Sequence, residues 1–144
     1  MKNILLNIIP FFFIGFAIIF FTSCREEIII PNNPVGNFNQ PLKNSFSNSY
    51  DFLIDAKNLT VGFSDTLEFR PAAYYINIKS ENHSSGFSDI TVFAEQNQMF
   101  FTHRVYSSDV IGYSFGIGKI PKRISITFNN FTGQLRVQLI RINN

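Results

Sequence analysis

Few residues in this chain could do chemistry, and their spacing is unfavourable for most reactions. Cys24 is the only cysteine, and His83 and His103 are the only histidines. A structural zinc site of ordinary ligand spacing cannot be assembled from these residues. There is no second cysteine for an internal disulfide. The sequence therefore predicts no metal or other cofactor, and a fold that is held together by core burial alone.

Catalytic motifs are also lacking. Serine, histidine and aspartate all occur, so a catalytic triad is not excluded, but no Gly-x-Ser-x-Gly segment marks a nucleophile. The glycine-rich segment 112–119 fails as a phosphate-binding loop, because no Ser or Thr follows Lys119 and Pro121 begins a strand where a helix would be needed. A calcium site between loops stays an alternative. The sequence favours a protein that is not an enzyme, with a hydrolase built on His103 or on a pair of aspartates as the rival.

The surroundings of Cys24 explain this residue better than catalysis does. Residues 4–21 are almost entirely apolar and follow a short positive start that contains Lys2, which is the pattern of a secretory signal. A run of this length could also span a bilayer as a retained helix. The residues next to the cysteine distinguish these two possibilities.

Phe21-Thr22-Ser23-Cys24 resembles the lipobox of bacterial lipoproteins, in which a hydrophobic residue and two small residues precede a cysteine. The resemblance covers only about the first 24 residues, and Phe21 stands where leucine is more usual. It implies that residues 1–23 are a signal peptide that is removed, and that Cys24 carries lipid acyl chains such as palmitate. Two or three chains anchor a protein stably, whereas one binds only marginally.

The residues that follow Cys24 indicate where such a lipoprotein is sent. Position 25 is Arg25 and not the aspartate that retains many Gram-negative lipoproteins at the inner membrane, so the resemblance implies an outer-membrane location. Glu26 and Glu27 resemble the surface-export signal of some Gram-negative lipoproteins. Display at the cell surface is therefore expected, with a solvated tether in the periplasm as the alternative.

The remaining composition limits the partners. Without residues 1–23 the chain carries 11 basic and 10 acidic residues, because Lys2 is the only charged residue removed. A nucleic-acid-binding domain would need basic residues clustered on one face, so nucleic acid is excluded as a partner. A length of 144 residues is enough for one domain.

Residues 24–49 read as the lipidated cysteine and a linker rich in Pro, Asn and Ser. Pro31, Pro34 and Pro41 disfavour both helices and internal strands. Ile28 to Ile30 and Phe38 are too apolar for a pure spacer, so part of the linker is expected to dock on the domain as an edge strand.

From residue 50 to residue 144 the apolar pattern has a period of two, which predicts strands. About nine short strands are expected, at 50–55, 59–64, 67–69, 74–79, 90–94, 99–106, 113–117, 124–128 and 135–142. Turn residues lie at 82–86, and a hairpin loop is expected at 129–133. This spacing predicts an all-β fold, an antiparallel β-sandwich of immunoglobulin-like or jelly-roll architecture, with a small barrel as the competitor.

Aromatic residues out of phase with the apolar pattern suggest a binding face. Strand alternation would place these side chains on the exposed side of one sheet, near Lys79: Tyr75, Phe93, Phe100, Arg104 and Tyr106. Exposed aromatic rings with polar neighbours could bind a glycan or an envelope protein. The alternative is that the linker, a loop or a second protomer covers them.

Together these observations predict a lipid-anchored outer-membrane protein whose β-sandwich is a non-enzymatic binding, adhesion or envelope-scaffold module. A hydrolase and an accessory subunit of an outer-membrane complex are the alternatives. A shallow aromatic surface would favour a ligand, a large apolar patch would favour a protein partner, and a polar cleft would favour an enzyme.

Overall fold

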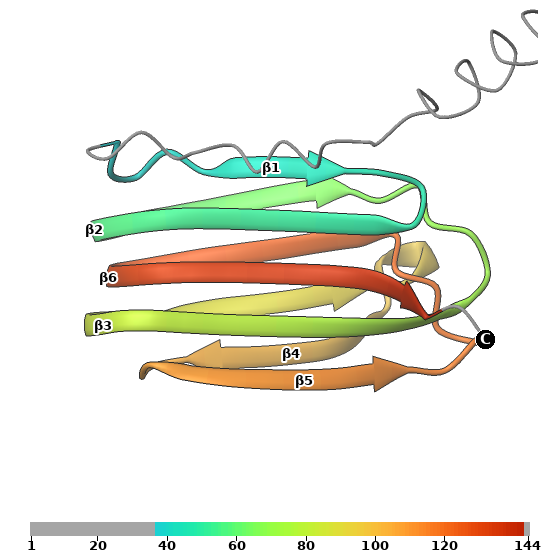
Figure 1. Cartoon of the computed structure of the whole chain (residues 1–144). Coiled ribbons are helices and arrows are strands. Elements are labelled where there is room, and N and C mark those ends of the chain that lie inside the picture. Colours follow the sequence, from blue (N-terminus) through green and yellow to red (C-terminus); the bar gives the residue numbers. More distant parts are fainter. Residues whose placement is uncertain (1–36, 143–144) are drawn as a thin grey trace, which may run out of the picture. The chain divides into compact units, whose positions relative to one another are not determined.

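A computed structural model describes residues 37–142, which form an antiparallel β-sandwich (Figure 1). The strands are β1 (Leu42–Ser45), β2 (Ser49–Thr66), β3 (Ala73–Phe93), β4 (Met99–Val105), β5 (Asp109–Phe115) and β6 (Arg123–Ile142), with a short 3-10 turn, η1 (Glu95–Asn97). Every strand pair is antiparallel. The predicted all-β class and sandwich are confirmed. The predicted signal peptide, Cys24 and the first part of the linker lie outside the described residues.

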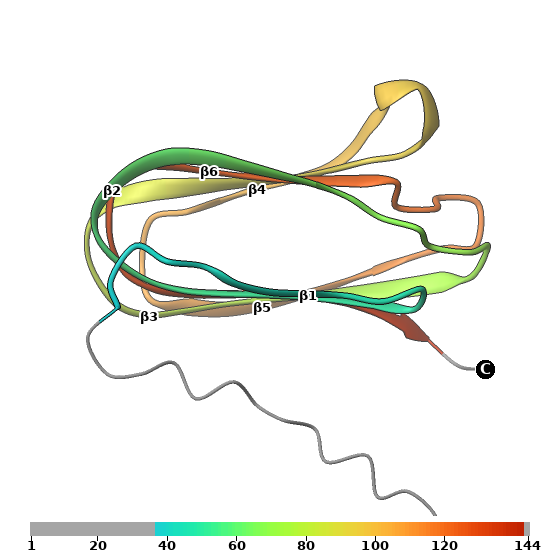
Figure 2. The same ribbon diagram turned by 90° about the horizontal axis from the view of Figure 1, so that it is seen from above.

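Three long strands, β2, β3 and β6, each run through both layers of the sandwich. Their halves form a five-stranded layer in the order β1, β2, β6, β3, β5 and a four-stranded layer in the order β2, β6, β3, β4. Figure 2 shows the long strands curving from one layer into the other. The two layers are therefore parts of one continuous, sharply bent sheet.

The long strands bend where residues tolerate a left-handed backbone. Non-glycine residues rarely adopt positive φ, and asparagine does so more readily than most. The positive-φ residues in these bends are Asn58 (49°), Asn82 (52°), Asn130 (48°), Gly86 (72°) and Gly133 (147°). The strand registers shift at the same places, as expected for β-bulges. A Cβ on Gly86 would overlap the backbone of Asn129 and Asn130, so this position requires glycine.

Side chains fasten two of these bends to each other. The Thr60 Oγ1 donates to Asn130 Oδ1 at 3.0 Å and accepts the Asn130 N–H at 2.9 Å. The Asn58 N–H donates to Thr132 Oγ1 at 2.9 Å. Backbone groups that the bulges remove from the ladder thus keep partners, which an irregular backbone requires.

Two expectations about the strands are corrected. The predicted turn at 82–86 and the hairpin loop at 129–133 are bends inside β3 and β6, because the same residues serve a tight turn and a bulge equally well. Residues 67–69 are not a strand, although Leu67 and Phe69 are buried. Eight of the nine expected short strands therefore correspond to five real ones, β2 to β6. The last part of the predicted linker supplies β1, which pairs with β2 from Leu42↔Leu53 to Ser45↔Tyr50.

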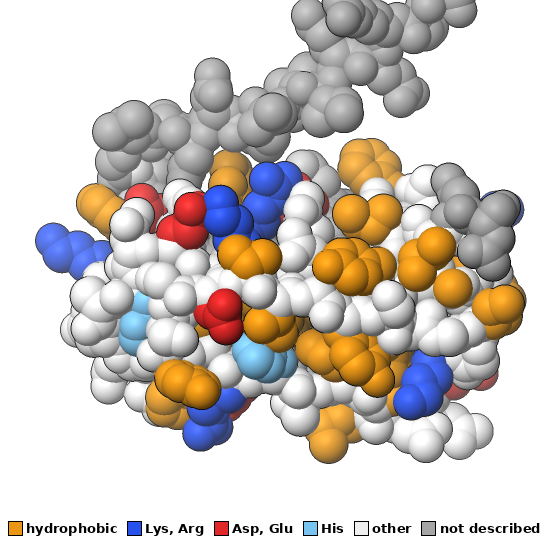
Figure 3. All heavy atoms as spheres, turned by 60° about the horizontal axis from the view of Figure 1, so that its bottom comes forward, with side chains coloured by type: hydrophobic (Ala, Val, Ile, Leu, Met, Phe, Trp, Pro, Cys, Tyr) orange, Lys and Arg blue, Asp and Glu red, His pale blue; other side chains and the backbone are white. Residues whose placement is uncertain are grey.

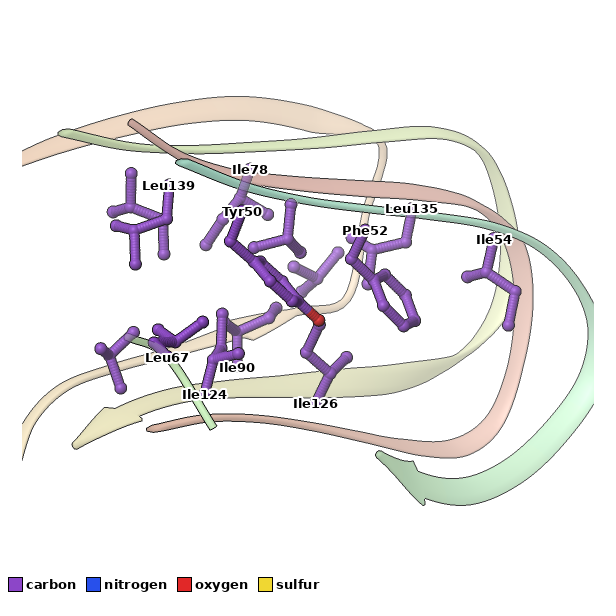
Figure 4. Close-up of a cluster of buried hydrophobic side chains, with 14 of the residues drawn as sticks. Tyr50, Phe52, Ile54, Leu67, Ile78, Ile90, Ile124, Ile126, Leu135 and Leu139 are labelled. Carbon is purple, nitrogen blue, oxygen red and sulfur yellow. The ribbon is translucent and has the colours of Figure 1, made fainter. Parts of the chain in front are cut away.

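The core lies between the two layers, where alternate residues of each strand meet (Figure 4). Tyr50, Phe52 and Ile54 of β2 point inward from the five-stranded layer, and Ile124 and Ile126 of β6 face them from the other layer. All are essentially inaccessible to solvent. Burying an aromatic or branched side chain stabilises the folded state by about 1.5–3 kcal/mol.

No helix within residues 37–142 is long and apolar enough to cross a membrane.

Candidate functional site

The two edge strands on one side of the sandwich, β4 and β5, define the candidate site. β4 pairs only with the second half of β3, and β5 pairs only with its first half, among the strands in the described part of the chain. Each is therefore the last strand of its layer. Because β3 belongs to both layers, its two neighbours lie on the same side of the molecule, as Figure 1 shows, although they belong to different layers (Figure 2).

Four aromatic rings fill the gap between these strands, and we call them the edge cluster: Phe100, Phe101, Tyr113 and Phe115. Phe115 is buried at the centre, with Phe100 at 5.1 Å and an interplanar angle of 88°, and Phe101 at 5.4 Å and 70°. Tyr113 lies 5.3 Å from Phe115 and 5.6 Å from Phe101. Edge-to-face pairs of this kind stabilise by about 0.5–1.5 kcal/mol beyond their burial.

The edge cluster is not fully covered. Tyr113 is 53% exposed, and large apolar side chains elsewhere on β4, on β5 and in the turn after β5 are exposed as well: Met99, Val110 and Ile117. Figure 3 shows hydrophobic side chains gathered in a band on the face that carries this edge. An apolar group of this kind on a soluble domain usually marks an interaction surface.

A shallow hollow of about 260 Å³ adjoins Tyr113, lined also by Ser114, Phe115, Gly116, Gly118 and Lys119. The turn at its rim is closed by the Lys119 N–H, which donates to the Gly116 carbonyl at 3.0 Å. A Cβ at Gly116 or Gly118 would meet open space. Gly116 and Gly118 thus lie in the turn after β5, with no neighbour that a Cβ would meet.

Gly112, in the middle of β5, has a different role. A Cβ at this position would overlap the Tyr75 hydroxyl, so the Tyr75 ring from β3 lies across the glycine. Only glycine leaves room for this ring on the outer surface of the five-stranded layer.

The predicted aromatic face is not assembled as one surface. Tyr75 lies on the outer surface of the five-stranded layer, whereas Phe93 lies on that of the four-stranded layer, under the Arg123 guanidinium at 3.8 Å. Both residues are in β3, which the sequence reading divided into two strands of one sheet. The bend carries the second half of β3 into the opposite layer, so the outward side chains of the two halves face apart.

Phe100 departs from the prediction for a second reason. Val92 pairs with Phe101 and Phe93 with Met99, so Phe100 is the extra residue of a bulge. The bulge shifts the alternation by one residue. Phe100 therefore packs against Phe115 in the edge cluster instead of lying on the outer surface.

Arg104 is engaged within the domain. Its guanidinium donates to both carboxylate oxygens of Asp89, at 2.7 and 2.9 Å, and lies 4.2 Å from the centre of the Phe87 ring. These hydrogen bonds lower the pKa of the Asp89 carboxyl and raise the pKa of Arg104. Tyr106 follows β4 and is 71% exposed, near the end of β5 that begins with Asp109.

The surroundings of His103 bear on the hydrolase alternative. His103 lines a hollow of about 50 Å³ together with Ser107 and Asp109. Pockets that bind small molecules usually measure about 300–1,000 Å³. Within residues 37–142 no hydrogen bond joins His103 to either residue, and no cluster of three or more potential metal ligands occurs.

Sequence reasoning missed Phe101, Tyr113 and Ile117. The period-two pattern at 113–117 places Tyr113 and Phe115 on one side of a strand, and the pairing with β3 confirms this phase. Their exposure depends on β5 being an edge strand, which only the long-range pairing determines. Two adjacent phenylalanines in β4 were the available signal, since strict alternation cannot bury both on one side.

No known protein family and no curated protein matches this sequence. Three solved structures show a distant likeness. A pilus protein of Bacillus endospore appendages has a TM-score of 0.46 and 10% identity, over 74% of this chain and 95% of that chain. BiXyn10A CBM1 has a TM-score of 0.39 and 8% identity, over 74% and 93%. A mutant carbohydrate binding module of family 29 has a TM-score of 0.35 and 14% identity, over 72% and 79%. The likeness of this chain to each of these three proteins is therefore remote.

Proposed function

We propose that this chain is a non-enzymatic binding module of a bacterial envelope, held there by lipid on Cys24, and that it binds a protein partner along the β4–β5 edge. The observation that carries the proposal is the exposed apolar group at this edge: Met99, Val110, Tyr113 and Ile117. Burial of such side chains against a partner is the main driving force of protein association.

A protein partner fits this edge better than a glycan. Phe100 and Phe101 pack edge-to-face on the buried Phe115, so within the edge cluster only Tyr113 offers an exposed ring. The hollow beside it holds one lysine and one serine as polar side chains. A glycan site would combine several free ring faces with fixed polar groups. Glycan binding at the Tyr113 hollow is the second candidate, supported by this hollow alone.

Of the two hollows described above, the one that contains His103 is the smaller. Its small size supports a non-enzymatic role. A hydrolase would need room there for a substrate and a hydrogen-bonded base.

The anchoring part of the proposal rests on the sequence around Cys24, with its lipobox-like residues and the Arg25-Glu26-Glu27 segment. The Cys24→Ala chain should accumulate as an unprocessed precursor without acyl label. Protease added to intact cells should degrade the domain if it is displayed at the outer-membrane surface. Normal maturation of the variant would contradict lipid attachment at Cys24. Full protection of the domain from protease would contradict its display at the cell surface.

The binding edge is tested with a photo-crosslinking amino acid placed at Tyr113 in the full chain, in living cells. The matched control carries it at Val61, an exposed apolar residue of β2 on the opposite side of the sandwich. We expect a protein adduct from position 113 and none from position 61. Absence of any adduct at 113, or equal adducts at both positions, would refute the proposed edge. Retention on envelope polysaccharide that is lost in Tyr113→Ser would favour the glycan candidate.

A further inference from the structure

The outer side of β5 is an unpaired strand edge. β5 pairs with β3 from Tyr74↔Phe115 to Ser80↔Asp109, and no other strand within residues 37–142 pairs with it. The Val110 N–H donates to the Asp109 carboxylate at 2.7 Å, so it points away from β3. Backbone groups of successive strand residues alternate in direction. The N–H and C=O groups of Gly112 and Ser114 therefore also point outward, where another strand could pair with them.

This edge lacks the features that usually prevent strand pairing. Natural edges are protected by lysine, proline, bulges or covering loops. β5 contains no Lys, Arg or Pro, and its ladder with β3 has no register shift. By contrast, the ladder between β3 and β4 contains a bulge, and β4 carries Arg104. β5 is the less protected of the two edges.

The sequence around β5 is complementary to itself in the antiparallel direction. If a two-fold axis passed beside Gly112, this residue would face Gly112 of the second copy. Val110 would then face Ser114 of the second copy. Both pairs have outward backbone groups, so they would form hydrogen-bonded pairs in this register, with the Val110 N–H exchanging the Asp109 carboxylate for the Ser114 carbonyl of the second copy. Asp109 would face Phe115 of the second copy, so no like charges oppose each other.

Charges and apolar side chains at the two ends of β5 match in the same register. Asp109 starts the strand, and Lys119 lies in the turn just after it, so each copy would bring its acidic end to the basic end of the other. Neither residue has an ion-pair partner among the residues that the structure describes. Tyr106 and Ile117, exposed beyond the two ends, would likewise approach each other across the axis.

We propose that the partner at this edge is a second copy of this chain, paired antiparallel through β5 about a two-fold axis at Gly112. This inference rests on the proposed function, because it names the occupant of the β4–β5 edge. Pairing joins the five-stranded layers of both copies into one sheet. It also covers Val110 and Tyr113 at the junction.

Engineered cysteines test the register in the full chain, purified in detergent. A chain with Val110→Cys is mixed with a chain with Ser114→Cys under mild oxidation. The two positions would face each other with Cα atoms about 5.5 Å apart, which suits a disulfide. In either variant alone the new cysteines would be about 14 Å apart across the axis, because four residues separate them at about 3.4 Å each. We expect a linked dimer from the mixture only, and the unaltered chain controls for Cys24.

Charge reversal tests the ends. Asp109→Lys should lower the dimer association constant, measured by sedimentation equilibrium, about tenfold. This corresponds to a loss of about 1.4 kcal/mol from the two ion pairs between Asp109 and Lys119 at the rim of the interface. The double variant Asp109→Lys with Lys119→Asp should restore it. No disulfide in the mixture, or a monomer at every concentration, would overturn the inference. A Tyr113 adduct that contains a different protein would overturn it and leave the proposed function standing, whereas no adduct would overturn both.

Discussion

The gap between the two layers is filled differently on the two sides of the sandwich. On the side of β1 and β2, Lys43 points between the layers, where its ammonium lies 2.9 Å from the Asp65 carboxylate and 5.0 Å from the centre of the Phe63 ring. The buried Tyr50 hydroxyl donates to the same carboxylate at 2.7 Å. On the β4–β5 side, the edge cluster fills the gap and Tyr113 stays half exposed. One side is completed by groups of its own chain, and the other leaves apolar side chains exposed.

The largest expected difference between the sides concerns core packing. Phe52→Ala, beside the Lys43–Asp65 pair, should lower the free energy of unfolding by about 3–5 kcal/mol, because it removes a fully buried ring. Tyr113→Ala should cost about 1 kcal/mol or less, because half of that ring is already in water. Urea denaturation of both variants measures the two values. Equal losses would show that Tyr113 contributes to the fold as much as the core does.

The Tyr50 hydroxyl should have a smaller effect that depends on pH. Tyr50→Phe should cost about 1–2 kcal/mol at neutral pH by removing the hydrogen bond to the Asp65 carboxylate. Burial, the Asp65 hydrogen bond and nearby carboxylates raise the pKa of Tyr50 above its ordinary value. The folded state therefore keeps a proton that the unfolded chain loses above about pH 10. This stability is fully present below that pH and is lost as pH rises beyond it.

The measurement for Tyr50 is the free energy of unfolding between pH 8 and 11. The wild type should lose up to about 1.4 kcal/mol per pH unit from this group above pH 10, and Tyr50→Phe should lose less. Tyr113→Phe, which removes an exposed hydroxyl, serves as the control and should follow the wild type. Identical slopes for Tyr50→Phe and the wild type would show that the Tyr50 proton is not linked to folding.

The smallest expected effect concerns Lys43. Lys43→Met keeps the apolar stem and removes the charge, so it should cost about 1 kcal/mol through the ion pair with Asp65 and the contact with Phe63. Lys79→Met removes a more exposed pair with Glu81 and should cost less. The difference should shrink in 1 M salt, where charges are screened within about 3 Å. If both variants lose the same amount, the ammonium does not help to close this side.

The sequence predicts local structure well and long-range arrangement poorly. Alternation in Tyr50-Asp51-Phe52 and in the residues after Tyr74 gives the strands and their inward faces correctly. The bends in β3 and β6 were read as turns, because asparagine and glycine permit both. Asp51 pairs with Arg136, which is 85 residues away, and no local pattern reveals such a partner. The identity of the edge strands, and hence the exposure of Tyr113, depends on that long-range pairing.

The short strand β1 has a mechanical consequence for a domain under tension. Because β1 runs antiparallel to β2 and turns directly into it, a pull on the chain before Leu42 acts first on Asn39, which is hydrogen-bonded to Asp55 and Lys57, and then on one end of the ladder, at Leu42↔Leu53. The pairs then open one after another toward Ser45↔Tyr50 instead of resisting together. Peeling of β1 would withdraw Lys43 from Asp65 and expose Phe52 and Phe63, while the long strands that form both layers keep the rest intact.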